Sequence, residues 1–212
     1  MQHVIILGGT TPVGQFISRN LLNAGLTVTS FSEQPDERKI IHPKYKTVQG
    51  DINNILVLES VLANRYDAVI NAFPVGYLTN LFYVTDTVKN MIVSMQENEL
   101  NRLIFFNYGQ YESYYFSHEK TGLHLWSLLE RRAENRLKTN YEKLIHQSGL
   151  DFTINTFDFS FLKEHRNDKP DELIRRYFIE VAQKAKQQIV HALNMKESIT
   201  LGLQESQTLV SR

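Results

Sequence analysis

The chain has 212 residues, of which 42% are apolar, and this is enough for the core of one ordinary α/β domain. Lysine and arginine together equal aspartate and glutamate, at 23 each, so no overall charge favours nucleic acid or an anionic membrane as a partner. The chain has no cysteine, which excludes disulfides, thiolate catalysis and cysteine-ligated metal. No apolar run approaches the roughly 18 residues of a membrane span, and we expect a cytoplasmic protein.

Apolar runs of strand length alternate with helical patterns along the whole chain. The predicted strands are His3–Leu7, Thr27–Phe31, Thr47–Gln49, Ala68–Ala72, Leu103–Asn107, Phe152–Thr156 and a late Ile199–Leu203. The predicted helices are Pro12–Ala24, Ile55–Ala63, Thr79–Glu97, Leu123–Gln147 and Asp171–Leu193. This alternation predicts a single domain over residues 1–212, with a doubly wound parallel sheet in the order 3-2-1-4-5-6 and helices on both faces.

The first strand leads directly into a glycine-rich turn, Gly8-Gly9-Thr10-Thr11-Pro12-Val13-Gly14. Gly8 can bend the chain out of the strand, and Gly14 lets the helix pack closely because it has no Cβ. Such a turn directs free backbone N–H groups and the positive end of the helix dipole at a pyrophosphate. The pattern predicts binding of NAD or NADP at residues 8 to 14, through Gly8, Thr10, Thr11, Pro12, Val13 and Gly14.

This glycine pattern departs from the usual fingerprint at Thr11, which stands where a middle glycine is expected. Its Cβ narrows the approach of a phosphate, although its hydroxyl can donate a hydrogen bond to one. The alternative is a turn without a ligand, in which Thr10 or Thr11 caps the helix and Pro12 is its first residue.

Four further segments follow the turn in a familiar order. They are Gly50-Asp51-Ile52 after the third strand, Asn71-Ala72-Phe73 at the end of the fourth, residues 138 to 154 with Lys138, Glu142 and Ser148-Gly149-Leu150-Asp151, and Ile179-Glu180-Val181-Ala182 near the end. Each alone can be a simple turn, loop cap or helix stop. Together the chain resembles the atypical short-chain dehydrogenase/reductase superfamily, and within it the NmrA-like and flavin-reductase-like NAD(P)H-binding proteins.

The resemblance implies an NAD(P)-binding Rossmann fold and a set of contacts with the cofactor. Asp51 and Ile52 would meet the adenine, Ala72 and Phe73 the ribose and phosphates, and Lys138 the nicotinamide ribose.

The choice of cofactor depends on the end of the second strand. Glu33 stands near the acidic position that pairs with the ribose hydroxyl of NAD. Ser32, Arg38 and Lys39 lie close to it in sequence and would instead suit a 2′-phosphate. We lean slightly to NAD.

The usual catalytic pair, Tyr-x-x-x-Lys, is missing from this region. Glu134 stands four residues before Lys138, so no tyrosine is placed there as a general acid. The candidates for catalysis are therefore Lys138, Tyr108 and Tyr115. Hydride transfer to a flavin or quinone needs no such acid, because water can supply the protons.

Two functions remain open. One is an oxidoreductase acting on a small flat redox acceptor, and the other is a non-catalytic redox sensor that engages a regulatory protein. A sugar-nucleotide epimerase fits poorly, since the chain is short and lacks the pair. The aromatic loop from Tyr108 to Phe116 predicts an acceptor pocket or, equally, loop packing or a homodimer contact. No spacing of histidines predicts a metal site.

Overall fold

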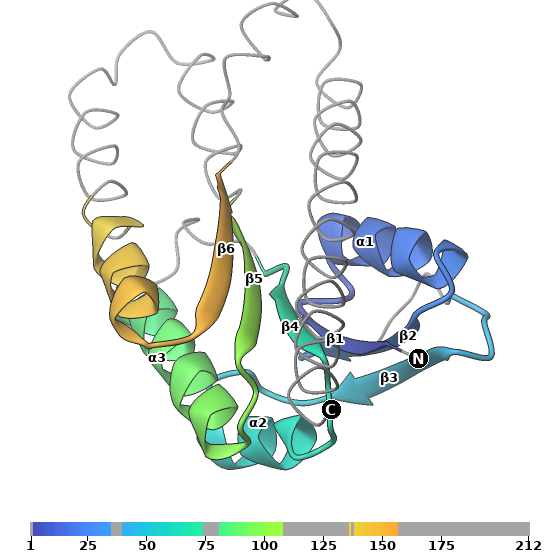
Figure 1. The fold of residues 1–212 in the computed structure, drawn as a ribbon, viewed down its shortest axis with the longest axis horizontal. Coiled ribbons are helices and arrows are strands. Elements are labelled where there is room, and N and C mark those ends of the chain that lie inside the picture. The colour runs from blue at the N-terminus through green and yellow to red at the C-terminus, as the bar shows by residue number, and fades with distance from the viewer. Residues whose placement is uncertain (1, 35–39, 74–80, 108–135, 137, 157–212) are drawn as a thin grey trace, which may run out of the picture.

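The structure is a computed structural model that describes residues 2–34, 40–73, 81–107, 136 and 138–156. Its six strands are β1 (His3–Leu7), β2 (Thr27–Ser32), β3 (Tyr45–Gln49), β4 (Ala68–Asn71), β5 (Arg102–Asn107) and β6 (Asp151–Thr156). The helices are α1 (Pro12–Asn23), α2 (Ile55–Leu62) and α3 (Leu81–Glu97), and residues 138–147 are also helical. All strand pairs are parallel, and the order β3-β2-β1-β4-β5-β6 confirms the predicted sheet (Figure 1).

The central strands β1, β2, β4 and β5 are buried on both faces, as expected for parallel strands with helical crossovers. Along β1, Val4 and Ile6 pack with α1 on one face, whereas Ile5 and Leu7 pack with α2 and α3 on the other. All four side chains are fully buried. The all-apolar sequence of this strand therefore reflects two cores, one on each side of the sheet.

The bounds of α1 follow from local sequence signals. Thr11 is the N-cap, and its Oγ1 accepts a hydrogen bond from the Gly14 N–H at 3.0 Å. Pro12 is the first helical residue, where its missing N–H costs no helical hydrogen bond. Gly25 follows the helix with φ of +90°, in the left-handed region that favours glycine.

Some bounds differ from the predicted ones or lie outside the described residues. β3 begins at Tyr45, two residues early, because Tyr45 and Lys46 continue the pairing with β2. Such pairing is a tertiary contact that local sequence does not reveal. The helix predicted from Leu123 is confirmed over residues 138–147. Its earlier part, the predicted helix Asp171–Leu193 and the late strand Ile199–Leu203 lie outside the described residues.

Candidate functional site

The glycine-rich turn brings together the carboxyl ends of three neighbouring strands. Gly8 has φ of +81°, and its N–H donates to the Phe31 carbonyl of β2 at 2.9 Å. A Cβ on Gly8 would lie 2.6 Å from the Phe73 nitrogen, just after β4. Only glycine fits this place, because the backbone is left-handed and the neighbouring backbone is too close for a side chain.

Gly14 and Thr11 hold the start of α1 against the turn. A Cβ on Gly14 would lie 2.3 Å from the Gly8 oxygen, so the first helical turn packs directly on the turn's backbone. The Thr11 hydroxyl lies 2.8 Å from the Gly8 oxygen and 2.9 Å from the Ala72 oxygen. Its single hydrogen is therefore directed at backbone carbonyls, and the expectation that it donates to a phosphate is not met in this arrangement.

Most backbone amides of the turn have an acceptor within the protein. The N–H groups of Gly8 and Gly9 donate to the Phe31 carbonyl, that of Thr10 to Ser32 Oγ, that of Thr11 to the Gly8 carbonyl and that of Gly14 to Thr11 Oγ1. Pro12 has no N–H. Within the described part of the chain, Val13 is left as the one residue of the turn whose amide lacks an acceptor. The sequence predicted several free amides here, whereas the folded turn leaves one without an acceptor.

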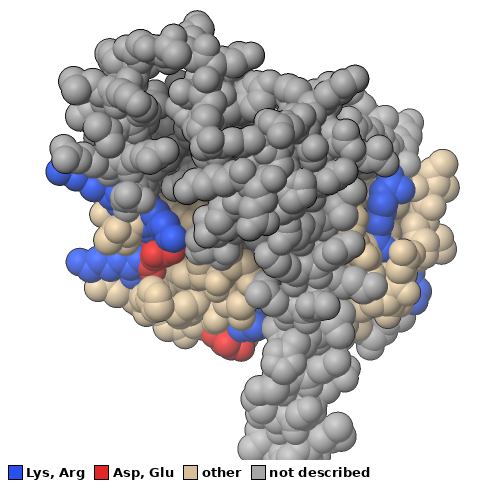
Figure 2. All heavy atoms as spheres, turned by 90° about the horizontal axis from the view of Figure 1, so that it is seen from above, with Lys and Arg blue, Asp and Glu red and all other residues tan. Residues whose placement is uncertain are grey.

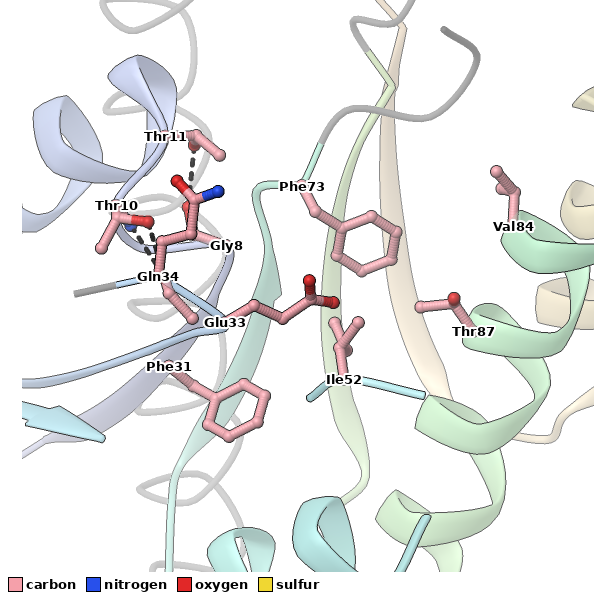
Figure 3. A pocket seen from close by; sticks show the side chains of 11 residues that line it. Gly8, Thr10, Thr11, Phe31, Glu33, Gln34, Ile52, Phe73, Val84 and Thr87 are labelled. Carbon is pink, nitrogen blue, oxygen red and sulfur yellow. Dashed lines mark hydrogen bonds between the residues drawn. The ribbon is translucent and has the colours of Figure 1, made fainter. Parts of the chain in front are cut away.

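Beside the turn lies a pocket of about 350 Å³ (Figure 3). Its lining residues are Gly8, Thr10, Thr11, Phe31, Ser32, Glu33, Gln34, Ile52, Phe73, Val84 and Thr87. Four of these side chains are large and apolar, and they form the part of the pocket that extends from the ends of β2 and β4 to α3. The volume and the mixture of apolar walls with a few polar groups are typical of a site for part of a dinucleotide.

The polar groups at the end of β2 meet this pocket directly. Ser32 Oγ accepts the Thr10 N–H at 3.1 Å and lies 2.8 Å from Thr10 Oγ1, so this hydroxyl pair ties β2 to the turn. Glu33 follows, and its side chain extends into the pocket towards α3 (Figure 3). A carboxylate there suits a ribose hydroxyl, which donates a hydrogen bond, and disfavours a phosphate.

Comparison with known proteins decides the family. Residues 8–169 match the profile of a family described as NAD(P)H-binding. The chain belongs to the NAD(P)H-binding family. The predicted resemblance to NmrA-like proteins is thereby confirmed. A search of curated proteins finds no significant match.

Solved structures agree with this family at the level of the fold. A Rossmann-fold NAD(P)-binding family protein from Shigella flexneri matches with TM-score 0.55 and 20% identity, over 74% of this chain and 66% of that one. The Bordetella bronchiseptica enzyme WbmH, solved with NAD+, matches with TM-score 0.54 and 18% identity, over 74% and 55%. A Veillonella parvula short-chain dehydrogenase/reductase, solved with NADP, matches with TM-score 0.53 and 14% identity, over 72% and 67%. The match thus covers about two thirds of the length of the first protein and about half of the length of the second.

The predicted cofactor residues of this NAD(P)H-binding protein divide into two groups. Gly8, Thr10, Thr11, Glu33, Ile52 and Phe73 line the pocket together. Val13, Gly14, Asp51, Ala72 and Lys138 are not among its lining residues, and the Pro12 side chain lies outside the described part of the chain. In the second group, Val13 and Ala72 are fully buried, and the Ala72 carbonyl accepts the Thr11 hydroxyl. The Asp51 side chain is exposed, and its Oδ1 accepts the Asn53 N–H at 2.8 Å, as in a local turn.

Lys138 lies on the helix that precedes β6, where its Nζ is 3.7 Å from Glu142 Oε1. The described tyrosine closest to it in sequence is Tyr141, whose ring stacks on Phe105 with 5.4 Å between centroids. Burial, with a smaller contribution from Glu142, raises the pKa of the Tyr141 phenol far above its usual range, although a hydrogen bond with Asn107 opposes the shift. A buried phenol with such a raised pKa is poorly suited to donate a proton near neutral pH. Tyr108 and Tyr115 lie outside the described residues.

A second hollow, of about 560 Å³, shares Thr10, Ser32 and Gln34 with the first and extends along β2 and β3. The described residues contain no cluster of three or more histidine or acidic side chains fit to hold a metal. None of the helices in the described ranges is long and apolar enough to cross a membrane. Figure 2 shows the described lysine and arginine side chains in separate groups at the margins of one face, where they form no continuous basic surface.

Four lining residues escaped sequence analysis as site residues: Phe31, Gln34, Val84 and Thr87. Phe31 was assigned only to a strand, and Gln34 and the two α3 residues had no role. The two α3 residues reach the pocket through packing between distant segments. Only the position of Phe31 at a strand's carboxyl end could have identified it, since ligands of open α/β sheets bind at that edge.

Proposed function

We propose that this protein binds NAD(P)H, with a preference for NADH, and reduces a flat acceptor of the flavin or quinone type in the cytoplasm. The proposal rests on one observation: Gly8, Glu33 and Ile52 line the same pocket, beside the start of α1. Bound NAD(P)H supplies the hydride, and water supplies the proton that the reduced acceptor takes up. No tyrosine is needed as an acid.

In this proposal the residues of the chain bind and orient the cofactor. The Val13 N–H and the N-terminal end of α1 face the pyrophosphate, Glu33 accepts a hydrogen bond from the adenosine ribose, and Phe73 closes the pocket beside β4. Lys138 would hold the nicotinamide ribose. The pocket of about 350 Å³ between β2, β4 and α3 supports this assignment of the adenosine half.

The test is a steady-state assay of NADH and NADPH oxidation, followed at 340 nm, with FMN, FAD and menadione each supplied as acceptor. Binding is measured separately by calorimetry. Turnover with at least one acceptor, at a rate well above that without protein, supports the oxidoreductase. Binding of the cofactor without turnover across the panel would reject it.

A second candidate is a non-catalytic dinucleotide-binding regulator that engages a protein partner. The burial of Tyr141 favours it, because the described part of the helix that carries Lys138 then presents no tyrosine to a substrate. Binding without turnover in the assay above is the result this candidate predicts.

Glu33→Gln should reverse part of the preference for NADH. The amide removes a charge-assisted hydrogen bond to the ribose and the repulsion that opposes a 2′-phosphate. We expect the ratio of NADPH to NADH affinity to rise about tenfold, a change of about 1.4 kcal/mol in relative binding free energy.

Fluorescence titration of both cofactors measures this ratio. Glu97→Gln, at the exposed end of α3, is the matched control and should leave it unchanged. An unchanged ratio in Glu33→Gln would show that this carboxylate does not meet the ribose.

A further inference from the structure

We propose that Phe105 is a positioning residue, which holds the ring of Phe73 in the wall of the pocket without touching the ligand itself. This inference rests on the proposed binding function and adds to it a residue from outside the pocket. Phe73 lines the pocket just after the end of β4, whereas Phe105 belongs to β5 and is not among the lining residues. The two rings meet edge to face, with 6.5 Å between their centroids and 80° between their planes.

Phe105 is the fixed member of this pair. It is fully buried, and the pairing of the strands places it between Asn71 of β4 and Ile154 of β6. Its ring stacks on that of Tyr141, with 5.4 Å between centroids and 28° between planes. The Tyr141 phenol in turn forms a hydrogen bond with Asn107, the last residue of β5. Because the strand and the neighbouring helix both hold this ring, Phe105 has little freedom to turn.

Phe73 is the member with more freedom. It follows β4, is only partly buried, and packs against the core with its ring at the pocket (Figure 3). A phenylalanine side chain has several rotamers, and a neighbouring ring in edge-to-face geometry favours one of them by up to about tenfold. A wall that is held in its bound arrangement beforehand lowers the cost of binding. Phe105 thereby contributes to affinity from outside the pocket.

Two neighbouring residues of β5 provide a matched pair of variants. Phe105 and Phe106 are both fully buried, but they belong to different cores. Phe105 lies in the core against which Phe73 packs, and Phe106 lies in the core beside α1, on the opposite face of the sheet. Leucine in place of either ring leaves a buried core underfilled. Both variants should therefore unfold at a lower urea concentration, but only Phe105→Leu should also change binding.

The binding of NAD is measured by calorimetry, below the start of each variant's unfolding transition. We expect Phe105→Leu to weaken binding about three- to tenfold and Phe106→Leu to leave it unchanged. Phe73→Leu should weaken binding as well. When Phe73→Leu is already present, adding Phe105→Leu should have no further effect, because the ring that Phe105 positions is gone.

Three results would overturn the inference while dinucleotide binding stands. The first is an unchanged affinity in Phe105→Leu. The second is an equal loss in Phe105→Leu and Phe106→Leu, which would indicate a general loosening of the sheet. The third is an additive loss in the double variant, which would mean that Phe105 does not act through Phe73.

NMR of the unsubstituted protein provides a test that does not depend on the folding of a core variant. With labelled phenylalanine, nuclear Overhauser effects should connect the rings of Phe73 and Phe105 both without and with NAD. Their absence without NAD would show that the wall is not held beforehand, and would overturn the inference. If the unsubstituted protein binds no dinucleotide, the proposed function falls and this inference falls with it.

Discussion

Gly8→Ala should destabilise the protein by about 2–5 kcal/mol and abolish dinucleotide binding. Two costs add at this residue. A non-glycine residue in the left-handed region costs roughly 1–2 kcal/mol, and overpacking typically costs about 1–3 kcal/mol. The second cost is high here because the new Cβ would lie 2.6 Å from the Phe73 nitrogen and 2.8 Å from the Ala72 carbonyl carbon. Backbone atoms of a buried strand end cannot move aside as a flexible side chain can.

The loss of binding follows from the same contact. Any shift of β4's end away from Gly8 moves Phe73, which lines the pocket, and the Ala72 carbonyl, which accepts the Thr11 hydroxyl. Urea denaturation measures the stability. Calorimetry below the start of the variant's unfolding transition measures binding by the folded fraction alone.

Gly25→Ala is the matched control, since it has the same backbone strain without the steric contact. Gly25 has φ of +90°, and a Cβ there would meet nothing within 4 Å. We expect a loss of roughly 1–2 kcal/mol, the cost of the left-handed backbone alone, with unchanged binding. If the two variants differ by less than about 1 kcal/mol, the close approach of Gly8 to β4 is not the constraint that we describe.

The sequence predicted the sheet well because its signals are local. The apolar run from Val4 to Leu7 is a strand, and Thr11, Pro12 and Gly25 set the ends of α1. The order of the strands follows from the handedness of successive crossovers and needs no knowledge of side-chain contacts. These features depend on neighbours in the chain, so a single sequence reveals them.

The site was predicted less completely, since part of it depends on contacts between distant segments. Glu33 and Ile52 were found from their spacing and from a resemblance, and both line the pocket. Thr87 precedes Val88 in a helix whose apolar stripe indicates only a core face, and nothing in that pattern marks Thr87 as a residue that lines a pocket. The hydrogen bond from the Thr10 N–H to Ser32 joins residues that are 22 positions apart in the sequence. It likewise forms only because β1 and β2 lie side by side.

The same limit explains why the number of free amides in the turn was overestimated. A glycine-rich turn predicts N–H groups that point at an anion, but it does not show which of them the protein itself uses. Gly8 and Gly9 donate to Phe31 of the neighbouring strand. Pro12 removes one more donor at the first position of the helix, and Val13 is left. The turn therefore offers fewer free amides to a phosphate than its glycine pattern suggests.

Pro12→Ala should consequently strengthen dinucleotide binding by roughly ten- to a hundredfold. Alanine keeps the helical start and adds an N–H at the first helical position, beside that of Val13, where unpaired amides and the helix dipole both favour an anion. A hydrogen bond to a charged group contributes about 1.5–3 kcal/mol, and each 1.4 kcal/mol is about tenfold in affinity. The gain should appear as a lower Kd in calorimetry with NAD.

A cost in stability accompanies this gain and can be separated from it. Loss of a proline frees the unfolded chain and lowers stability by about 0.4–1 kcal/mol. Pro43→Ala, in the exposed turn before β3, should show a similar loss of stability and no change in affinity. If Pro12→Ala binds NAD more tightly although it is less stable, the higher affinity cannot result from a larger folded fraction. The result would then place the pyrophosphate at the N-terminal end of α1. An unchanged or weaker affinity in Pro12→Ala would mean that the phosphates lie elsewhere, and that the Val13 amide has another role.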